Sequence, residues 1–229
     1  FNHGKMTFSL MYAYSENFIL VLSHDEVVHL KCSMLGKMPG DKDDKFANLK
    51  LAYAYMSGHP GKKLLFMGQE FGQWNEWSEK KALDWYLLED PSHKELKEFT
   101  KACMMLNKKY KCLYETDYSP EGFRWINAND RDNSVFSFIR ISPDKKRHLL
   151  FVLNFTPVER MHHRIGVPIK GKYKLVLGDD LKNQKKTLTS IHGECDGYKD
   201  SLLIDLHRYG IAVYEFNGDV NAHKPTKIS

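Results

Sequence analysis

The 229-residue sequence lacks several features that would place a protein in a class at once. No apolar run approaches the ~20 residues that a membrane-spanning helix needs, and the N-terminus does not have the basic, apolar and small-residue pattern of a signal peptide. Of the four cysteines, none forms a C-x-x-C pair, and no histidine pair completes a zinc site. We therefore expect no membrane partner, no metal or organic cofactor, and reduced, mostly buried thiols in the cytoplasm.

The sequence also lacks a block of charge of one sign. It has 34 basic and 29 acidic residues, and they are interleaved, as in "KDDK" and "KELKEF". This pattern is typical of a solvated surface and argues against a nucleic-acid partner. With 42% hydrophobic residues, the chain can build a sizeable core. It begins with Phe1 and not with Met, which predicts further residues upstream.

Up to Tyr110, strand-like and helix-like segments alternate. Short apolar runs at 18–22 ("FILVL") and 62–68 ("KKLLFMG") predict strands buried on both faces. Helices are predicted at 6–15, 44–57 and 91–110. Ser92 and Glu95 are expected to form a capping box at the start of the last helix. Strand, helix, strand, helix is the repeating unit of a parallel α/β sheet or barrel. Two such units cannot close a barrel or form a core by themselves, so the first half is expected to be the tail end of a larger fold.

After Tyr110 the pattern changes to short β-rich runs separated by turn residues. Seven such runs are present: "GFRWI", "SVFSFIRI", "HLLFVLNF", "YKLVLG", "TLTSI", "SLLIDL" and "IAVYEF". No helical pattern interrupts them, which indicates an all-β antiparallel sandwich. We assign the sandwich to residues 111–218 and a polar, frayed tail to 219–229.

Polar side chains follow each of the two early strands. His24, Asp25 and Glu26 come after the first strand, and Gln69 and Glu70 after the second. In α/β barrels, catalytic groups lie at the C-terminal ends of the strands. Carboxylates near aromatic residues suit a sugar substrate, because indoles stack on sugar rings and carboxylates stabilise an oxocarbenium-like state. The nearby tryptophans are Trp74, Trp77 and Trp85.

Two other interpretations of these residues were weighed. A zinc protease needs H-E-x-x-H on a helix, whereas His24 and His29 are five residues apart and follow a strand. In a purely structural role, His24 and Asp25 would simply cap the end of the strand. Composition alone leaves that structural role open.

Three segments carry a family resemblance: "FILVLSHDEVVHLK", "MPGDKDDKFANLKLAYAYMSGHPGKKLLFMGQEFGQWNEW" and "LDWYLLE". They resemble the 1,4-α-glucan (glycogen) branching enzymes of the α-amylase family, and the likeness extends into the sandwich. The resemblance implies that residues 1–110 are the C-terminal part of the catalytic (β/α)8 barrel. The resemblance implies that Asp25 is the carboxylate that stabilises the transition state and that His24 binds the same sugar. It implies supporting roles for Glu26 and Glu70, with Glu70 more structural than catalytic.

Two residues depart from the pattern of that family. Val21 replaces a proline inside the strand and should be tolerated. Leu30 replaces a glycine, and a glycine at such a place often has a positive φ or packs closely. The departure therefore concerns the geometry of the loop after Asp25.

The resemblance further implies a retaining transfer that cuts an α-1,4-glucan and re-attaches the segment through an α-1,6 bond. Such a reaction also needs a nucleophilic Asp and a general-acid Glu, which the family carries on earlier barrel strands. We therefore expect this chain to be the C-terminal portion of the enzyme, inactive alone, with α-glucan as its partner. The alternatives are another α-amylase-type hydrolase, trehalose-releasing or debranching, and a non-catalytic glucan-binding module.

Overall fold

The computed structural model describes residues 3–221, which form two compact units. One unit is Phe18–Lys108, and the other combines the described residues of Phe1–Asn17 and Lys109–Ser229. Residues 3–17 thus group with the β-rich unit, although the sequence placed them with the first half of the chain. Within residues 3–221, no helix combines the length and apolar character needed to cross a bilayer.

Strands and helices alternate in the first unit. Its elements are β1 (Ile19–Leu22), η2 (His24–Glu26), α2 (Met34–Lys37), α3 (Lys42–Gly58), β2 (Lys62–Leu65), η3 (Gln69–Phe71), η4 (Trp85–Glu89) and α4 (Pro91–Lys109). β1 and β2 pair in parallel, and Leu22 lies opposite Leu65. The two strand–helix pairs that the apolar periodicity predicts are therefore present.

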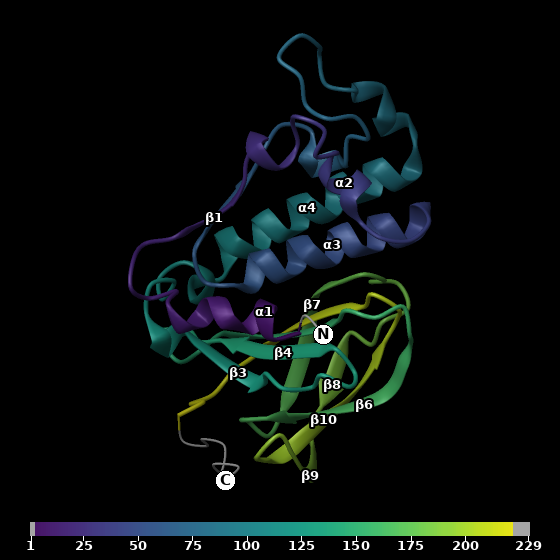
Figure 1. The fold of residues 1–229 in the computed structure, drawn as a ribbon. Helices are drawn as coiled ribbons and strands as arrows, with labels where there is room; N and C mark the ends of the chain where they lie inside the picture. Colours follow the sequence, from purple (N-terminus) through teal and green to yellow (C-terminus); the bar gives the residue numbers. More distant parts are fainter. Residues whose placement is uncertain (1–2, 222–229) are drawn as a thin grey trace. The chain divides into compact units, whose positions relative to one another are not determined.

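The long helices α3 and α4 run side by side (Figure 1). α3 begins two residues earlier than predicted because the Asp41 side chain accepts a hydrogen bond from the Asp44 amide (2.9 Å) and caps it. Lys50 of α3 reaches Glu95 of α4 with an Nζ–Oε1 distance of 2.6 Å. The predicted capping box of Ser92 and Glu95 is wrong: α4 already starts at Pro91, and the Asp90 carboxylate accepts from the Ser92 amide (2.9 Å).

The strand pair is less buried than its apolar sequence predicts. Ile19 and Val21 are 55% and 46% exposed, while Leu20 and Leu22 are half-buried. Burial on both faces is therefore the wrong expectation for β1 in this structure. Within residues 3–221, β1 and β2 pair only with each other, so the outer edges of this two-stranded sheet carry no further strand.

The second unit is built from two antiparallel sheets. Its short helices are α1 (His3–Phe8), η1 (Ser9–Met11), η5 (Lys111–Leu113) and η6 (Pro120–Gly122). Its strands are β3 (Phe123–Asn127), β4 (Val135–Arg140), β5 (His148–Asn154), β6 (Arg160–Val167), β7 (Lys172–Gly178), β8 (Thr187–Thr189), β9 (Ile191–Cys195), β10 (Tyr198–Leu206) and β11 (Ile211–Phe216). The sheets have the orders β3-β4-β5-β11-β7-β8 and β6-β10-β9 (Figure 1).

The two sheets share one apolar core, so the predicted sandwich is confirmed. Ile139, Leu150 and Tyr214 of the larger sheet pack in the same cluster as Leu202 and Ile204 of the smaller one. The sequence missed β6 and β9, since β6 begins with the polar run "RMHHR" and β9 is separated from β8 by Ser190 alone. The predicted tail also starts too early, because Val220 is buried in this core; residues 222–229 lie outside the described part.

A buried ion pair ties the segment before β3 to the sandwich. Arg140 and Asp117 are 0% and 1% exposed, with an Nη2–Oδ1 distance of 3.1 Å, and Arg140 Nε also donates to the Gly122 carbonyl. The Tyr14 hydroxyl lies in the electrostatic field of this pair. Burial raises the pKa of Tyr14 to about 12, even though the positive charge of Arg140 lowers it. Removing one partner would leave an uncompensated buried charge.

We expect Asp117→Ala to lower the free energy of unfolding of the β-rich unit by about 3–5 kcal/mol, because Arg140 would stay buried without its carboxylate. Glu194→Ala on the exposed part of β9 is the control and should change it by no more than about 0.5 kcal/mol. Urea denaturation followed by circular dichroism measures both. Equal effects of the two substitutions would show that the pair contributes nothing.

Candidate functional site

The parallel pairing of β1 and β2 brings the residues after both strands to one edge. Leu22 and Leu65 are the last partners in register, so Ser23 and Phe66 leave the sheet next to each other. This is the carboxyl edge of the strands, where the sequence predicted the site. Both predicted clusters, 24–26 and 69–70, follow directly in the short helices η2 and η3.

A capping box shapes the turn after β1. Glu26 Oε2 accepts from the Ser23 amide (2.7 Å) and from Ser23 Oγ (3.1 Å), while Ser23 Oγ accepts from the Asp25 amide (3.2 Å). The turn is thus a single 3-10 turn and not an open loop. Glu26 holds its backbone, in line with the supporting role expected for it.

The side chains of His24 and Asp25 accept or donate none of the capping hydrogen bonds. Their side chains are 56% and 71% exposed, and His24 Nε2 lies 3.3 Å from Asp25 Oδ1. Ser23 and Glu26 form the cap at the strand end, which removes the main argument for a purely capping role of His24 and Asp25. The two exposed side chains present an imidazole and a carboxylate together at the edge of the sheet.

Aromatic rings connect the two strand ends. The ring centroids of His24 and Phe66 are 5.9 Å apart, and those of Phe66 and Trp77 are 5.1 Å apart. The other two tryptophans pack elsewhere in the unit: Trp74 meets Phe46 of α3, and Trp85 meets Phe71. Trp77 is therefore the tryptophan that joins the aromatic row beside His24.

Gln69 and Glu70 have different surroundings. Gln69 is 4% exposed; its Oε1 accepts from the Phe66 amide (3.3 Å), and its backbone carbonyl accepts from the Tyr53 hydroxyl (2.8 Å). Its Nε2 has no hydrogen-bond partner. Glu70 is half-buried. Burial of Tyr53 raises the pKa of that tyrosine, and the negative charge of Glu70 raises it further. The structural role expected for Glu70 stays a prediction.

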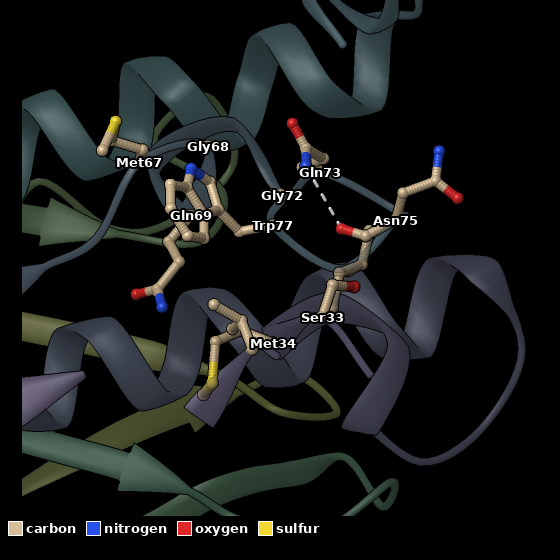
Figure 2. A pocket seen from close by; sticks show the side chains of 11 residues that line it. Ser33, Met34, Met67, Gly68, Gln69, Gly72, Gln73, Asn75 and Trp77 are labelled. Atoms are coloured by element: carbon tan, nitrogen blue, oxygen red, sulfur yellow. Dashed lines mark hydrogen bonds between the residues drawn. The ribbon is translucent and has the colours of Figure 1, made fainter. Parts of the chain in front are cut away.

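A small recess lies between residues 27–35 and 67–77, and Figure 2 shows the side chains around it. Trp77, Met34, Met67 and Gln69 stand on one side of the view, and Ser33, Gln73 and Asn75 on the other. Gln73 Nε2 donates to the Asn75 carbonyl (3.2 Å), a hydrogen bond within the lining of the recess.

The loop after the turn contains an arrangement that sequence reasoning only partly anticipated. His29, Leu30 and Cys32 have φ values of 57°, 65° and 63°. The positive φ at Leu30 confirms the concern raised by the missing glycine. The Glu76 carboxylate accepts from the amides of Leu30 (3.1 Å) and Cys32 (2.6 Å). Glu76 was missed, because a glutamate 46 residues away carries no local signal of such contacts.

The comparisons with known proteins agree with the all-β fold of the second unit. Residues 125–217 match the family model "Alpha amylase, C-terminal all-beta domain". The solved structure of a debranching enzyme from Nostoc punctiforme covers 86% of this chain and 35% of that chain with a TM-score of 0.57 at 14% identity. AmyP in complex with maltose covers 81% of this chain and 36% of that one with a TM-score of 0.54 at 15% identity. The chain thus contains an α-amylase-type C-terminal β domain.

Sequence relatives narrow this class. The chain is 49% identical to the 1,4-alpha-glucan branching enzyme GlgB of Butyrivibrio fibrisolvens, over 93% of this chain and 35% of that protein. It is 51% identical to the enzyme of the same name from Aquifex aeolicus, over 80% of this chain and 29% of that protein. The chain is therefore a relative of the 1,4-α-glucan branching enzymes and corresponds to a C-terminal portion of them. It spans about a third of the length of these relatives.

We expect Leu30→Gly to stabilise the Phe18–Lys108 unit by about 0.5–1 kcal/mol. A non-glycine residue in the left-handed conformation costs ~1–2 kcal/mol, which glycine avoids. Glycine loses ~0.5–1 kcal/mol more in chain entropy on folding, and this offsets part of the gain. Little packing is lost, because Leu30 is 96% exposed. Urea denaturation followed by tryptophan fluorescence measures the change. Leu30→Ala keeps the β-carbon and should have no such effect; a lower stability of the glycine variant would contradict the argument.

Proposed function

We propose that this chain is the C-terminal part of a glycogen-type branching enzyme. The observation that carries the proposal is the 49% identity over 93% of the chain to a protein named for that activity. The geometry of the site supports it, since His24 and Asp25 stand exposed beyond a parallel strand, 3.3 Å apart. On this proposal, residues 1–110 complete a (β/α)8 barrel, and the sandwich beginning at 111 follows it. The free edges of the β1–β2 pair would then hydrogen-bond to further barrel strands.

The proposed reaction is a retaining transfer between α-glucan chains. A carboxylate attacks the anomeric carbon, the α-1,4 C–O bond breaks, and a general acid gives its proton to the leaving 4-oxygen. A 6-hydroxyl then attacks the glycosyl-enzyme ester and returns a proton to the same acid–base group. The attacking carboxylate and the acid are proposed to lie outside this chain, so the chain alone should be inactive.

In this scheme Asp25 holds sugar hydroxyls and favours the oxocarbenium-like transition state, while His24 binds the same sugar. Glu26 fixes the turn, and Glu70 acts within the unit. No metal or organic cofactor is needed, and α-glucan is the proposed partner. The free cysteines suit a cytoplasmic setting, because none of the four is in a disulfide. The hydrolase alternatives are not favoured, since the likeness to the debranching enzyme is one of fold alone.

We expect Asp25→Asn to lower kcat for branching by about 10²–10³-fold, the usual cost of one preorganised electrostatic contact. The assay uses the protein encoded together with the sequence upstream of Phe1 and follows the loss of iodine staining of amylose. Reducing sugar should not rise in proportion. His192→Gln, at an exposed position of the β domain, is the control for a substitution outside the site.

Two outcomes would contradict the proposal. Release of reducing sugar in step with the loss of staining indicates a hydrolase. Glucan binding without turnover, unchanged by Asp25→Ala, indicates a non-catalytic binding module.

A further inference from the structure

The loop that follows the Asp25 turn is held in an unfavourable backbone conformation. Three of its residues, His29, Leu30 and Cys32, lie in the left-handed region. Non-glycine residues rarely adopt it, because the β-carbon crowds the following carbonyl oxygen. Such a segment keeps its shape only where surrounding contacts determine it.

The contacts that determine it come from one short segment after β2. Glu76 binds the amides of Leu30 and Cys32 with both carboxylate oxygens, at 3.1 and 2.6 Å. The next residue, Trp77, donates its amide to the Val27 carbonyl at 3.1 Å. Backbone N–H groups in left-handed conformations converge to make a concavity suited to an anion. Here a carboxylate of the same chain fills it.

The clamped loop is in turn tied to Asp25. Lys31, between the two amides that Glu76 binds, donates from Nζ to the Asp25 carbonyl at 2.8 Å. Val27, which Trp77 holds, closes the 3-10 turn with its own amide on the His24 carbonyl at 2.9 Å. Hydrogen bonds therefore connect Glu76 to the loop, and further hydrogen bonds connect the loop to the Asp25 turn.

We propose that Glu76 is a positioning residue for Asp25: by binding the Leu30 and Cys32 amides, it fixes the loop from which the Asp25 turn is held. The catalytic part of this inference rests on the proposed branching function, and the structural part does not. Glu76 has no contact with Asp25 itself among the hydrogen bonds described. It acts through the backbone of residues 27–32.

The structural part is tested on the chain as it stands, by amide hydrogen exchange of Glu76→Gln. The amide side chain keeps the size of glutamate but loses one of the two acceptors. We expect exchange at Leu30 and Cys32 to speed up about ten-fold or more, and exchange at Asp25 and Val27 to speed up with it. Glu79→Gln, an exposed glutamate three residues further along the same segment, is the matched control and should change neither pair.

Unchanged exchange at Leu30 and Cys32 would overturn the clamp. Faster exchange there with unchanged Asp25 and Val27 would overturn its transmission to the turn, and Glu76 would then serve the loop alone.

The catalytic part is tested in the protein that includes the upstream sequence. We expect Glu76→Gln to lower kcat for branching about ten-fold or more, with KM for amylose changed less than about three-fold, because a displaced Asp25 loses transition-state contacts more than ground-state ones. An unchanged kcat would overturn the positioning role. If the unsubstituted protein shows no branching, the proposed function fails, and the exchange data decide the structural part on their own.

Discussion

The parallel register of β1 and β2 is the constraint on which the candidate site depends. With Leu22 opposite Leu65, the chain must leave both strands at the same edge. That places the 3-10 turn of His24–Glu26 beside Phe66 and allows the His24, Phe66 and Trp77 rings to meet. A shift of one residue would turn every side chain of the strand to its other face and separate these groups. Two hydrogen-bonded strands thus assemble residues more than 40 positions apart.

Around this edge, the carboxylates have separate tasks. Glu26 accepts from the Ser23 amide, Glu76 from the amides of Leu30 and Cys32, and Asp90 caps α4. Each of them satisfies backbone donors that would otherwise lack a partner within a helix or strand. Asp25 differs, because its side chain is 71% exposed and meets His24. Asp25 is therefore the carboxylate of the turn that the backbone leaves free, in line with the role proposed for it.

Sequence reasoning succeeded where the signal was local. Apolar runs located both strands, helical periodicity located α3 and α4 to within two residues at each end, and the polar residues after the first run placed His24 and Asp25 at a strand end. It failed where the structure depends on distant partners. The first half of β6 is polar, and the buried Val220 lies in a polar stretch. The role of Glu76 depends on hydrogen bonds from amides that are 44 and 46 residues away in the sequence.

The departure at Leu30 shows how such distant contacts compensate for a local cost. A glycine would adopt the left-handed conformation without strain, and leucine does not. The conformation nevertheless persists here, next to left-handed His29 and with the Leu30 side chain 96% exposed, so packing of that side chain cannot explain it. The Glu76 carboxylate on two converging amides is a sufficient cause, since charge-assisted hydrogen bonds are about twice as strong as neutral ones. The loop therefore takes its shape from its partner across the sheet edge more than from its own sequence.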